Sequence, residues 1–167
     1  MNAFAKVVAQ PMLLGTCQGT IDGTEEFRAG LVELSEATYP PPHGEAYVML
    51  ATQRRPGPDY TTKELKVSFS KGYDEDDYGL TPEDHVVRVL FIDSSIPAKP
   101  VVYSQSKGIA RVVYDSDSST FSGTVCAELE NLDEDTRRIV NIKVDFATFP
   151  NVRNRRIPRR PSPRAHC

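Results

Sequence analysis

The densest group of side chains able to do chemistry is an acidic stretch between Lys71 and His85. Carboxylate oxygens are ligands that Ca²⁺ prefers, so this stretch is a candidate metal site. An EF-hand alignment fails because Tyr78 occupies a ligand position and His85 stands where a bidentate glutamate belongs. A solvated loop with turns at glycine and proline is the simpler interpretation. The candidate Ca²⁺ ligands are Asp74, Asp76, Asp77 and Asp84.

The other residues with catalytic or ligand chemistry are scattered. The histidines, His43, His85 and His166, form no pair at metal-ligand spacing, so no zinc site is expected. Cys126 falls on the polar face of a predicted strand, which could expose it, but a nucleophilic cysteine also needs a base. No Gly-x-Ser-x-Gly elbow, phosphate loop or dinucleotide fingerprint occurs. We assign no catalytic and no cofactor-binding residue, and the prediction leans away from an enzyme.

The charge of the chain is divided between two parts. Residues 151–167 contain six arginines, three prolines and no acid, whereas all 23 acidic residues and the other 14 basic ones lie in 1–150. The body therefore carries −9 and the tail +6, which gives the net −3. With few large aliphatic side chains, the tail is predicted to be disordered or loosely docked. Its candidate interaction residues are Arg155, Arg156, Arg159 and Arg160.

The elements that must position these residues are strands. Polar and apolar residues alternate over 64–69, 121–129 and 138–149, as in half-buried strands. Segments 45–51 and 86–92 are apolar on both faces and predict inner strands. Turn-forming Asp and Ser between these runs make 108–149 a predicted three-stranded antiparallel meander.

One segment fits two structures. Residues 24–35 place Phe27, Leu31 and Leu34 at helical spacing after a potential N-cap at Thr24, but Leu31 followed by Val32 also suits a strand. We predict a strand because the neighbouring segments are strands. Eight to ten strands at this spacing predict an all-β fold: a single antiparallel β-sandwich over 1–150, with a closed up-and-down β-barrel as the alternative.

Three functions follow as expectations. The leading one is a non-enzymatic accessory or protein-interaction domain, because a well-patterned sheet carries no catalytic constellation. The second is a loop-based binder of Ca²⁺ or carbohydrate at residues 74–84, since a tyrosine exposed beside the loop could stack on a sugar ring; the candidates are Tyr47, Tyr60, Tyr73 and Tyr78. The third is a carrier of a small apolar ligand, if the fold is a hollow barrel. Nucleic acid is not an expected partner, because no aromatic residue is interleaved with the tail arginines.

The cysteines and apolar runs predict a compartment. Three cysteines without a close pair make a disulfide framework unexpected and a reducing cytoplasm the default. Leu14 to Cys17 faintly resembles a bacterial lipoprotein cleavage box, so an exported lipoprotein modified at Cys17 is the alternative. No apolar run approaches the ~20 residues that a membrane-spanning helix needs.

Overall fold

The computed structural model describes residues 15–55, 61–133 and 137–150, and this part of the chain forms ten strands. The basic tail with Arg155, Arg156, Arg159 and Arg160 lies outside the described residues, so the division near residue 150 stays a prediction. The strands are β1 (Gly15–Ile21), β2 (Glu25–Arg28), β3 (Leu31–Thr38), β4 (Glu45–Arg54), β5 (Thr62–Ser70), β6 (Asp76–Gly79), β7 (Val87–Ser94), β8 (Val101–Asp115), β9 (Thr120–Asn131) and β10 (Arg138–Thr148).

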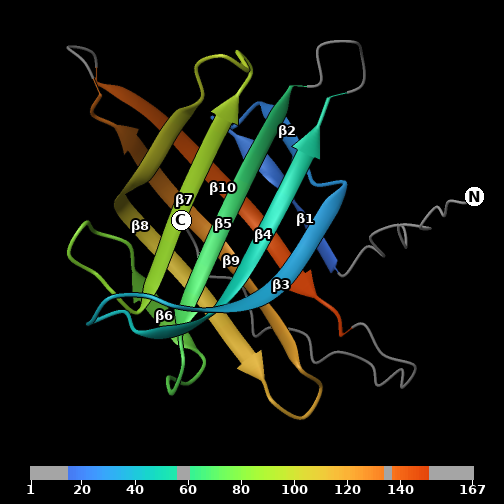
Figure 1. Cartoon of the computed structure of the whole chain (residues 1–167), viewed down its shortest axis with the longest axis vertical. Coiled ribbons are helices and arrows are strands. Elements are labelled where there is room, and N and C mark those ends of the chain that lie inside the picture. Colours follow the sequence, from blue (N-terminus) through green and yellow to red (C-terminus); the bar gives the residue numbers. More distant parts are fainter. Residues whose placement is uncertain (1–14, 56–60, 134–136, 151–167) are drawn as a thin grey trace, which may run out of the picture.

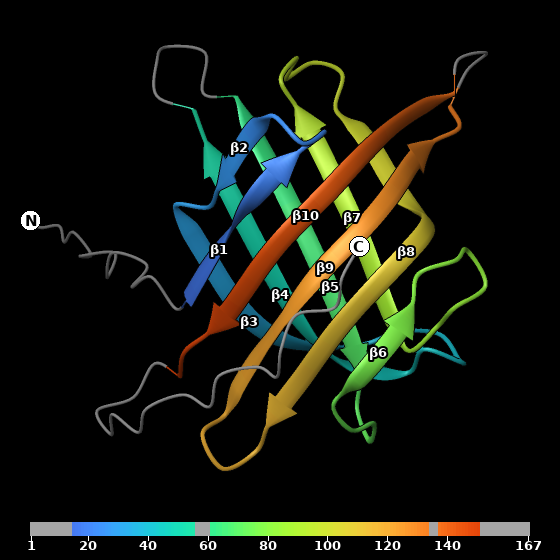
Figure 2. The same cartoon turned by 180° about the vertical axis from the view of Figure 1, so that it is seen from behind.

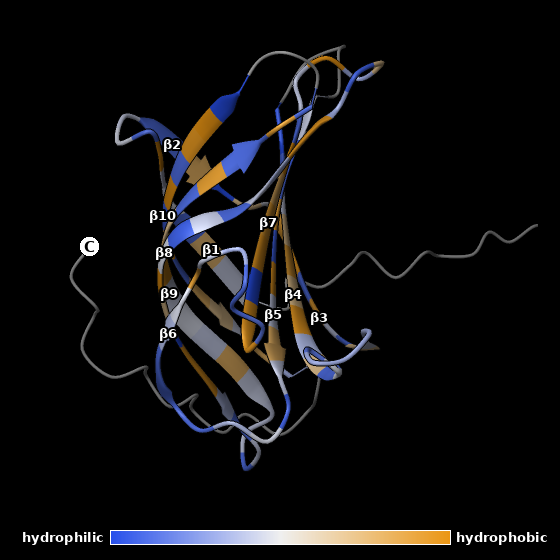
Figure 3. Cartoon of the chain, turned by 90° about the vertical axis from the view of Figure 1, so that its left-hand side faces the viewer, coloured by the Kyte–Doolittle hydropathy of each residue, from blue (hydrophilic) through white to orange (hydrophobic). Residues whose placement is uncertain are grey.

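All ten strands belong to one antiparallel sheet in the order β2-β1-β10-β9-β8-β7-β5-β4-β3, with β6 paired to β8 beside this path. The sheet curls into a half-barrel, so that β8, β9 and β10 face β4, β5 and β7 across a shared interior (Figures 1 and 2). Figure 3 shows these two halves edge-on. The predicted all-β class is confirmed, and the shape lies between the predicted sandwich and the closed barrel. The meander over 108–149 is also confirmed, as β8, β9 and β10.

The two edge strands, β2 and β3, follow one another in the chain and nearly close the sheet. Between them, the backbone N–H of Ala29 donates to Cys17 O on β1 (2.9 Å), and that of Gly30 donates to Thr52 O on β4 (3.0 Å). The chain thus crosses from one half of the sheet to the other within two residues. This crossing confirms the strand prediction for 24–35, with a break at its glycine.

The interior of the half-barrel is filled by apolar side chains, most of them aliphatic, and phenylalanines from both halves pack against one another within it. Phe121 on β9 stacks on Phe69 of β5 with ring centroids 5.9 Å apart, and meets Phe146 of β10 edge-on at 5.0 Å. Phe27 and Phe91 form a second edge-on pair at 6.3 Å. These rings are at most 3% exposed. Packing between rings of opposite halves therefore holds the curled sheet together.

The halves of the sheet separate at the lower end of β7, and a polar side chain fills the gap. There β8 exchanges its partner β7 for the short strand β6, and a bulge interrupts β8 near Gln105. The side chain of Gln105 is 2% exposed, accepts a hydrogen bond from Val89 N (2.8 Å) and donates to Thr81 O (2.8 Å). It ties the loop after β6 to the sheet. The sequence interpretation of 71–85 as one loop was wrong here, because β6 lies within it.

Among the residues that the structure describes, there is no helix long and apolar enough to span a membrane.

Candidate functional site

Two cavities open on the outer faces of the sheet. We call the first the His43 cleft: it lies over β5 and β7, between the β3–β4 loop (residues 39–44) and the β6–β7 loop (residues 80–86), with a volume of about 390 Å³. Both loops meet at the same lower corner of the half-barrel (Figure 1). The cleft is lined by Tyr39, Pro40, Pro42, His43, Lys66, Ser68, Pro82, Glu83, Asp84, His85, Arg88, Val89 and Leu90.

The second cavity, the β9 groove, is larger, at about 620 Å³, and runs over the outer face of β8, β9 and β10. Its walls include Ile109, Cys126 and the side chains of Lys107, Glu128 and Lys143. Lys107 and Glu128 face each other at 3.8 Å, and both ends of this pair are in reach of solvent. Volume alone favours the groove, but the His43 cleft holds an imidazole hydrogen-bonded to two hydroxyls and has two cations in its lining, so we place the candidate site there. Neither cavity lies inside the half-barrel, so neither supports an apolar-ligand carrier.

The floor of the His43 cleft is a buried histidine held by two serines of β5. His43 is 8% exposed, and Ser68 and Ser70 are each 3% exposed. The Nε2 atom of His43 lies 2.8 Å from Ser68 Oγ, and its Nδ1 atom lies 2.8 Å from Ser70 Oγ. Nδ1 also forms a short hydrogen bond with the backbone carbonyl of His85. The imidazole thereby joins the two loops to the sheet between them.

These contacts determine which nitrogen carries the proton. The carbonyl of His85 can only accept, so Nδ1 must donate to it. Ser70 agrees with this assignment, because its hydroxyl proton has two backbone carbonyl acceptors, His43 O at 2.7 Å and His85 O at 3.3 Å, so its oxygen can accept from Nδ1. A neutral imidazole that carries its proton on Nδ1 has a lone pair on Nε2, which accepts the hydroxyl proton of Ser68.

The surroundings also keep this imidazole neutral. Burial is the largest effect, and it lowers the pKa of His43 below its ordinary value of 6.5. The hydrogen bond to the His85 carbonyl raises this pKa, whereas the positive charge of Arg88 lowers it further. The unfolded chain therefore binds this proton more readily than the folded chain. The stability that neutral His43 contributes is present above about pH 6.5 and is lost as the pH falls through the lowered pKa.

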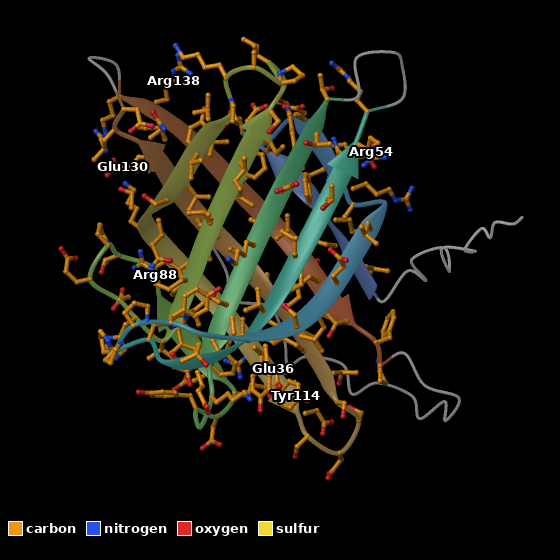
Figure 4. The ribbon with its side chains drawn as sticks, in the orientation of Figure 1. Glu36, Arg54, Arg88, Tyr114, Glu130 and Arg138 are labelled. Atoms are coloured by element: carbon orange, nitrogen blue, oxygen red, sulfur yellow. The ribbon has the colours of Figure 1, made fainter. Side chains whose placement is uncertain are left out.

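Two cations line the cleft beside the histidine. The guanidinium of Arg88, on β7, donates through Nη1 to the backbone carbonyls of Pro82 (3.0 Å) and Asp84 (2.8 Å), and Nη2 and Nε carry its other N–H groups (Figure 4). The ammonium of Lys66, on β5, lies 5.4 Å from the ring centroid of Tyr39. Arg88 thus fixes the β6–β7 loop, and Lys66 fixes the ring that walls the opposite side.

The predicted metal ligands are held by different partners. The Asp84 carboxylate accepts from Thr81 N (2.8 Å) and Thr81 Oγ1 (2.9 Å), and these bonds lower the pKa of Asp84. Asp77 pairs with Arg111 at 3.1 Å, and Asp76 accepts from the backbone N–H of Asp77 at 2.7 Å. Of these residues only Asp84 belongs to the cleft lining.

Asp74, the remaining candidate, takes part through its backbone carbonyl, which accepts from Tyr78 Oη at 2.6 Å. A search of the described ranges finds no group of three or more His, Cys, Asp or Glu arranged to hold a metal ion. The Ca²⁺ assignment to these aspartates stays a prediction. Tyr73, beside them, is 47% exposed, as the carbohydrate alternative requires.

The cysteines do not take part in the site. Cys126 is 8% exposed, although its place on the polar face of its strand predicts exposure. It is disulfide-bonded and lies in the groove rather than near His85. Cys17 is buried in β1 at 1% exposure, and burial raises its pKa to about 12. A lipid on Cys17 would require this thiol to leave the core.

Sequence reasoning missed the central residues of the site. The sequence predicts His43 in a proline-rich loop and Ser68 on the polar face of a strand, and both predictions are confirmed. One signal in the sequence could have linked His43 to Ser68. The outer face of β5, which should be solvated, has two small polar residues, Ser68 and Ser70, after Lys66. Small polar residues on a solvent face are suited to a position that another segment covers.

The chain matches no protein-family model, no curated protein and no solved structure.

Proposed function

We propose that the protein is a binding protein that takes a small polar ligand, bearing a carboxylate or carbonyl oxygen, into the His43 cleft. The observation that carries the proposal is the convergence of Lys66, Arg88 and the Ser68–His43 pair on one concave site of about 390 Å³. Ligand sites of this size combine an apolar wall with a few fixed polar groups.

The lining of the cleft matches an oxygen-bearing ligand. The guanidinium of Arg88 and the ammonium of Lys66 are donors only, so they favour acceptor oxygens, and most strongly charged ones. Tyr39, Pro40 and Pro42 provide an apolar wall for the carbon skeleton of the ligand. Because a tyrosine ring also stacks on sugars, the carbohydrate alternative applies to this cleft as well as to Tyr73.

A fragment screen tests this function. We expect short carboxylates, or else methyl glycosides, to shift the amide NMR signals of Tyr39 and Ser68. Replacing Lys66→Gln should weaken binding of the carboxylates about tenfold, since a hydrogen bond to a charged group contributes roughly 1.5 kcal/mol. The matched control is Lys143→Gln, which removes a cation from the groove on the other face and should leave affinity unchanged. Fragments that shift only groove signals, or that bind K66Q as tightly as the unaltered chain, would contradict the proposal.

A second candidate is the protein-interaction role, and a patch of exposed apolar side chains favours it. Val102 on β8 is 43% exposed, Leu132 after β9 is 67% exposed and Ile139 on β10 is 43% exposed. The three lie at the same end of neighbouring strands, where Asn131 donates to the backbone carbonyl of Val102 at 2.7 Å. Exposed apolar residues that gather in this way mark surfaces for protein partners.

A further inference from the structure

We propose that Ser68 is a nucleophile and His43 its general base, so that the cleft cleaves small carboxylic esters by forming an acyl-Ser68 intermediate. This inference rests on the proposed function, because the ester must first enter the His43 cleft. It adds a reaction to that binding. No serine was singled out from the sequence, since Ser68 belongs to no recognised nucleophile motif.

The first support is the contact between nucleophile and base. An activated serine needs a base within about 2.6–3.2 Å of its hydroxyl. Ser68 Oγ lies 2.8 Å from Nε2 of His43, and Nε2 is the nitrogen that the hydrogen-bond network leaves without a proton. The hydroxyl proton of Ser68 thus already points at the atom that would remove it.

The second support is that a third group orients the base. In known hydrolytic triads a carboxylate or amide fixes the tautomer and the ring position of the histidine. Here the backbone carbonyl of His85 has this role from the β6–β7 loop, through its short bond to Nδ1. Ser70 Oγ, 2.8 Å from Nδ1 and 2.7 Å from the His43 carbonyl, holds the ring from the strand side. His43 is therefore fixed from two elements, as a base in a defined orientation must be.

The third support is positive charge beside the nucleophile. Arg88 is the cross-strand partner of Ser68 in the register of β5 and β7, so both side chains lie on the outer face at the same level. Lys66 precedes Ser68 by two residues on that face. Both cations line the cleft with Ser68, where their fields stabilise the oxyanion that forms when a carbonyl carbon is attacked.

The reaction needs only ester and water. Ser68 Oγ attacks the carbonyl carbon, and its proton moves to Nε2 of His43. The tetrahedral intermediate collapses, the carbon–oxygen bond to the leaving alcohol breaks, and Nε2 returns the proton to that alcohol. Water, deprotonated by Nε2, then attacks the acyl group and releases a carboxylic acid and free Ser68. No oxidant, metal or further co-reactant takes part.

Covalent labelling tests this inference on the full chain. We expect a fluorophosphonate probe to add one phosphonyl group per molecule, mapped by peptide mass spectrometry to Ser68, and urea to abolish the labelling. S68A should abolish the labelling, because alanine lacks the oxygen that attacks the probe. The matched control is Ser35→Ala, which should leave the labelling unchanged. Ser35 is exposed and lies in the same cross-strand row of the outer face as Ser68, two strands away from it.

The outcomes separate this inference from the proposed function. Labelling of unaltered protein at Ser68 supports the nucleophile without any variant having to fold. No adduct, an adduct at another residue, or equal labelling of S68A overturns it. If fragments still bind in the cleft of S68A and of the unaltered chain while no adduct forms, binding stands and the reaction fails. If neither fragments nor probe enter the cleft, both proposals fail.

Discussion

Replacing Phe121→Ala should lower the free energy of unfolding by about 4 kcal/mol, in the range for deleting a fully buried phenylalanine. Phe121 is 0% exposed and contacts rings from both halves of the half-barrel, Phe69 at 5.9 Å and Phe146 at 5.0 Å. Its loss leaves a cavity at the point where the halves meet, and the strands on either side cannot close over it without changing the curl of the sheet. Urea unfolding followed by circular dichroism measures the change.

A surface aromatic provides the control for this result. Tyr73 is 47% exposed and its ring lies perpendicular to that of Tyr78 with centroids 6.3 Å apart, so Tyr73→Ala should cost less than about 1 kcal/mol. If F121A were destabilised no more than Y73A, the interior would not be a packed core, and the hollow-barrel alternative would regain support.

A second large effect is expected at a glycine of β1. A Cβ at Gly19 would lie 1.8 Å from the backbone oxygen of Lys143 and 2.7 Å from Cα of Val144, both on β10. Neither atom can move without breaking the ladder between β1 and β10, so Gly19→Ala should cost about 3 kcal/mol or more. The close approach lets β1 follow the curl of the sheet.

Gly30 is the matched control for Gly19. Nothing lies within 4 Å of a Cβ built on Gly30, at the crossing between β2 and β3. G30A should therefore change stability by less than about 1 kcal/mol, with a small gain expected because alanine restricts the unfolded chain. Equal midpoints of urea unfolding for the two variants would contradict the close approach of β1 to β10.

The alternation of residues was sufficient to predict the sheet. Val140, Ile142, Val144 and Phe146 face the interior, as their spacing indicated, because a strand places every second residue on one face. Curvature was not predictable in this way. It depends on close backbone approaches such as that of Gly19, and on the bulge of β8, which a pattern of polar and apolar residues does not record.

The candidate site was harder to predict because its members are distant in sequence. Alternation places Ser68 on an outer face but does not tell what covers that face. Ser68 is covered by His43, which lies 25 residues before it in the chain. The orientation of the His43 ring depends in turn on the carbonyl of His85, 42 residues after His43. The loop that bears His85 is in turn held by Gln105, a polar residue buried at the bulge of β8. Local sequence contains none of these pairings.

The acidic residues between 74 and 84 are close together in the sequence, but their side chains have different partners in the structure. Asp77 pairs with Arg111, and Asp84 caps the turn at Thr81. Their density in sequence reflects a short strand, where Asp77 has a cationic partner, and a turn, where Asp84 is bonded to the neutral groups of Thr81.

The state of His43 is the most direct test of the account, since binding and reaction both depend on the network at the floor of the cleft. Selective ¹⁵N labelling of histidine followed by NMR from pH 5 to 8 reports the protonation of each ring nitrogen. We predict that at pH 7 His43 carries one proton on Nδ1 and none on Nε2, and that it becomes doubly protonated only below pH 6.5, because burial and Arg88 lower its pKa. A proton on Nε2 at pH 7, or a midpoint above 6.5, would contradict the account.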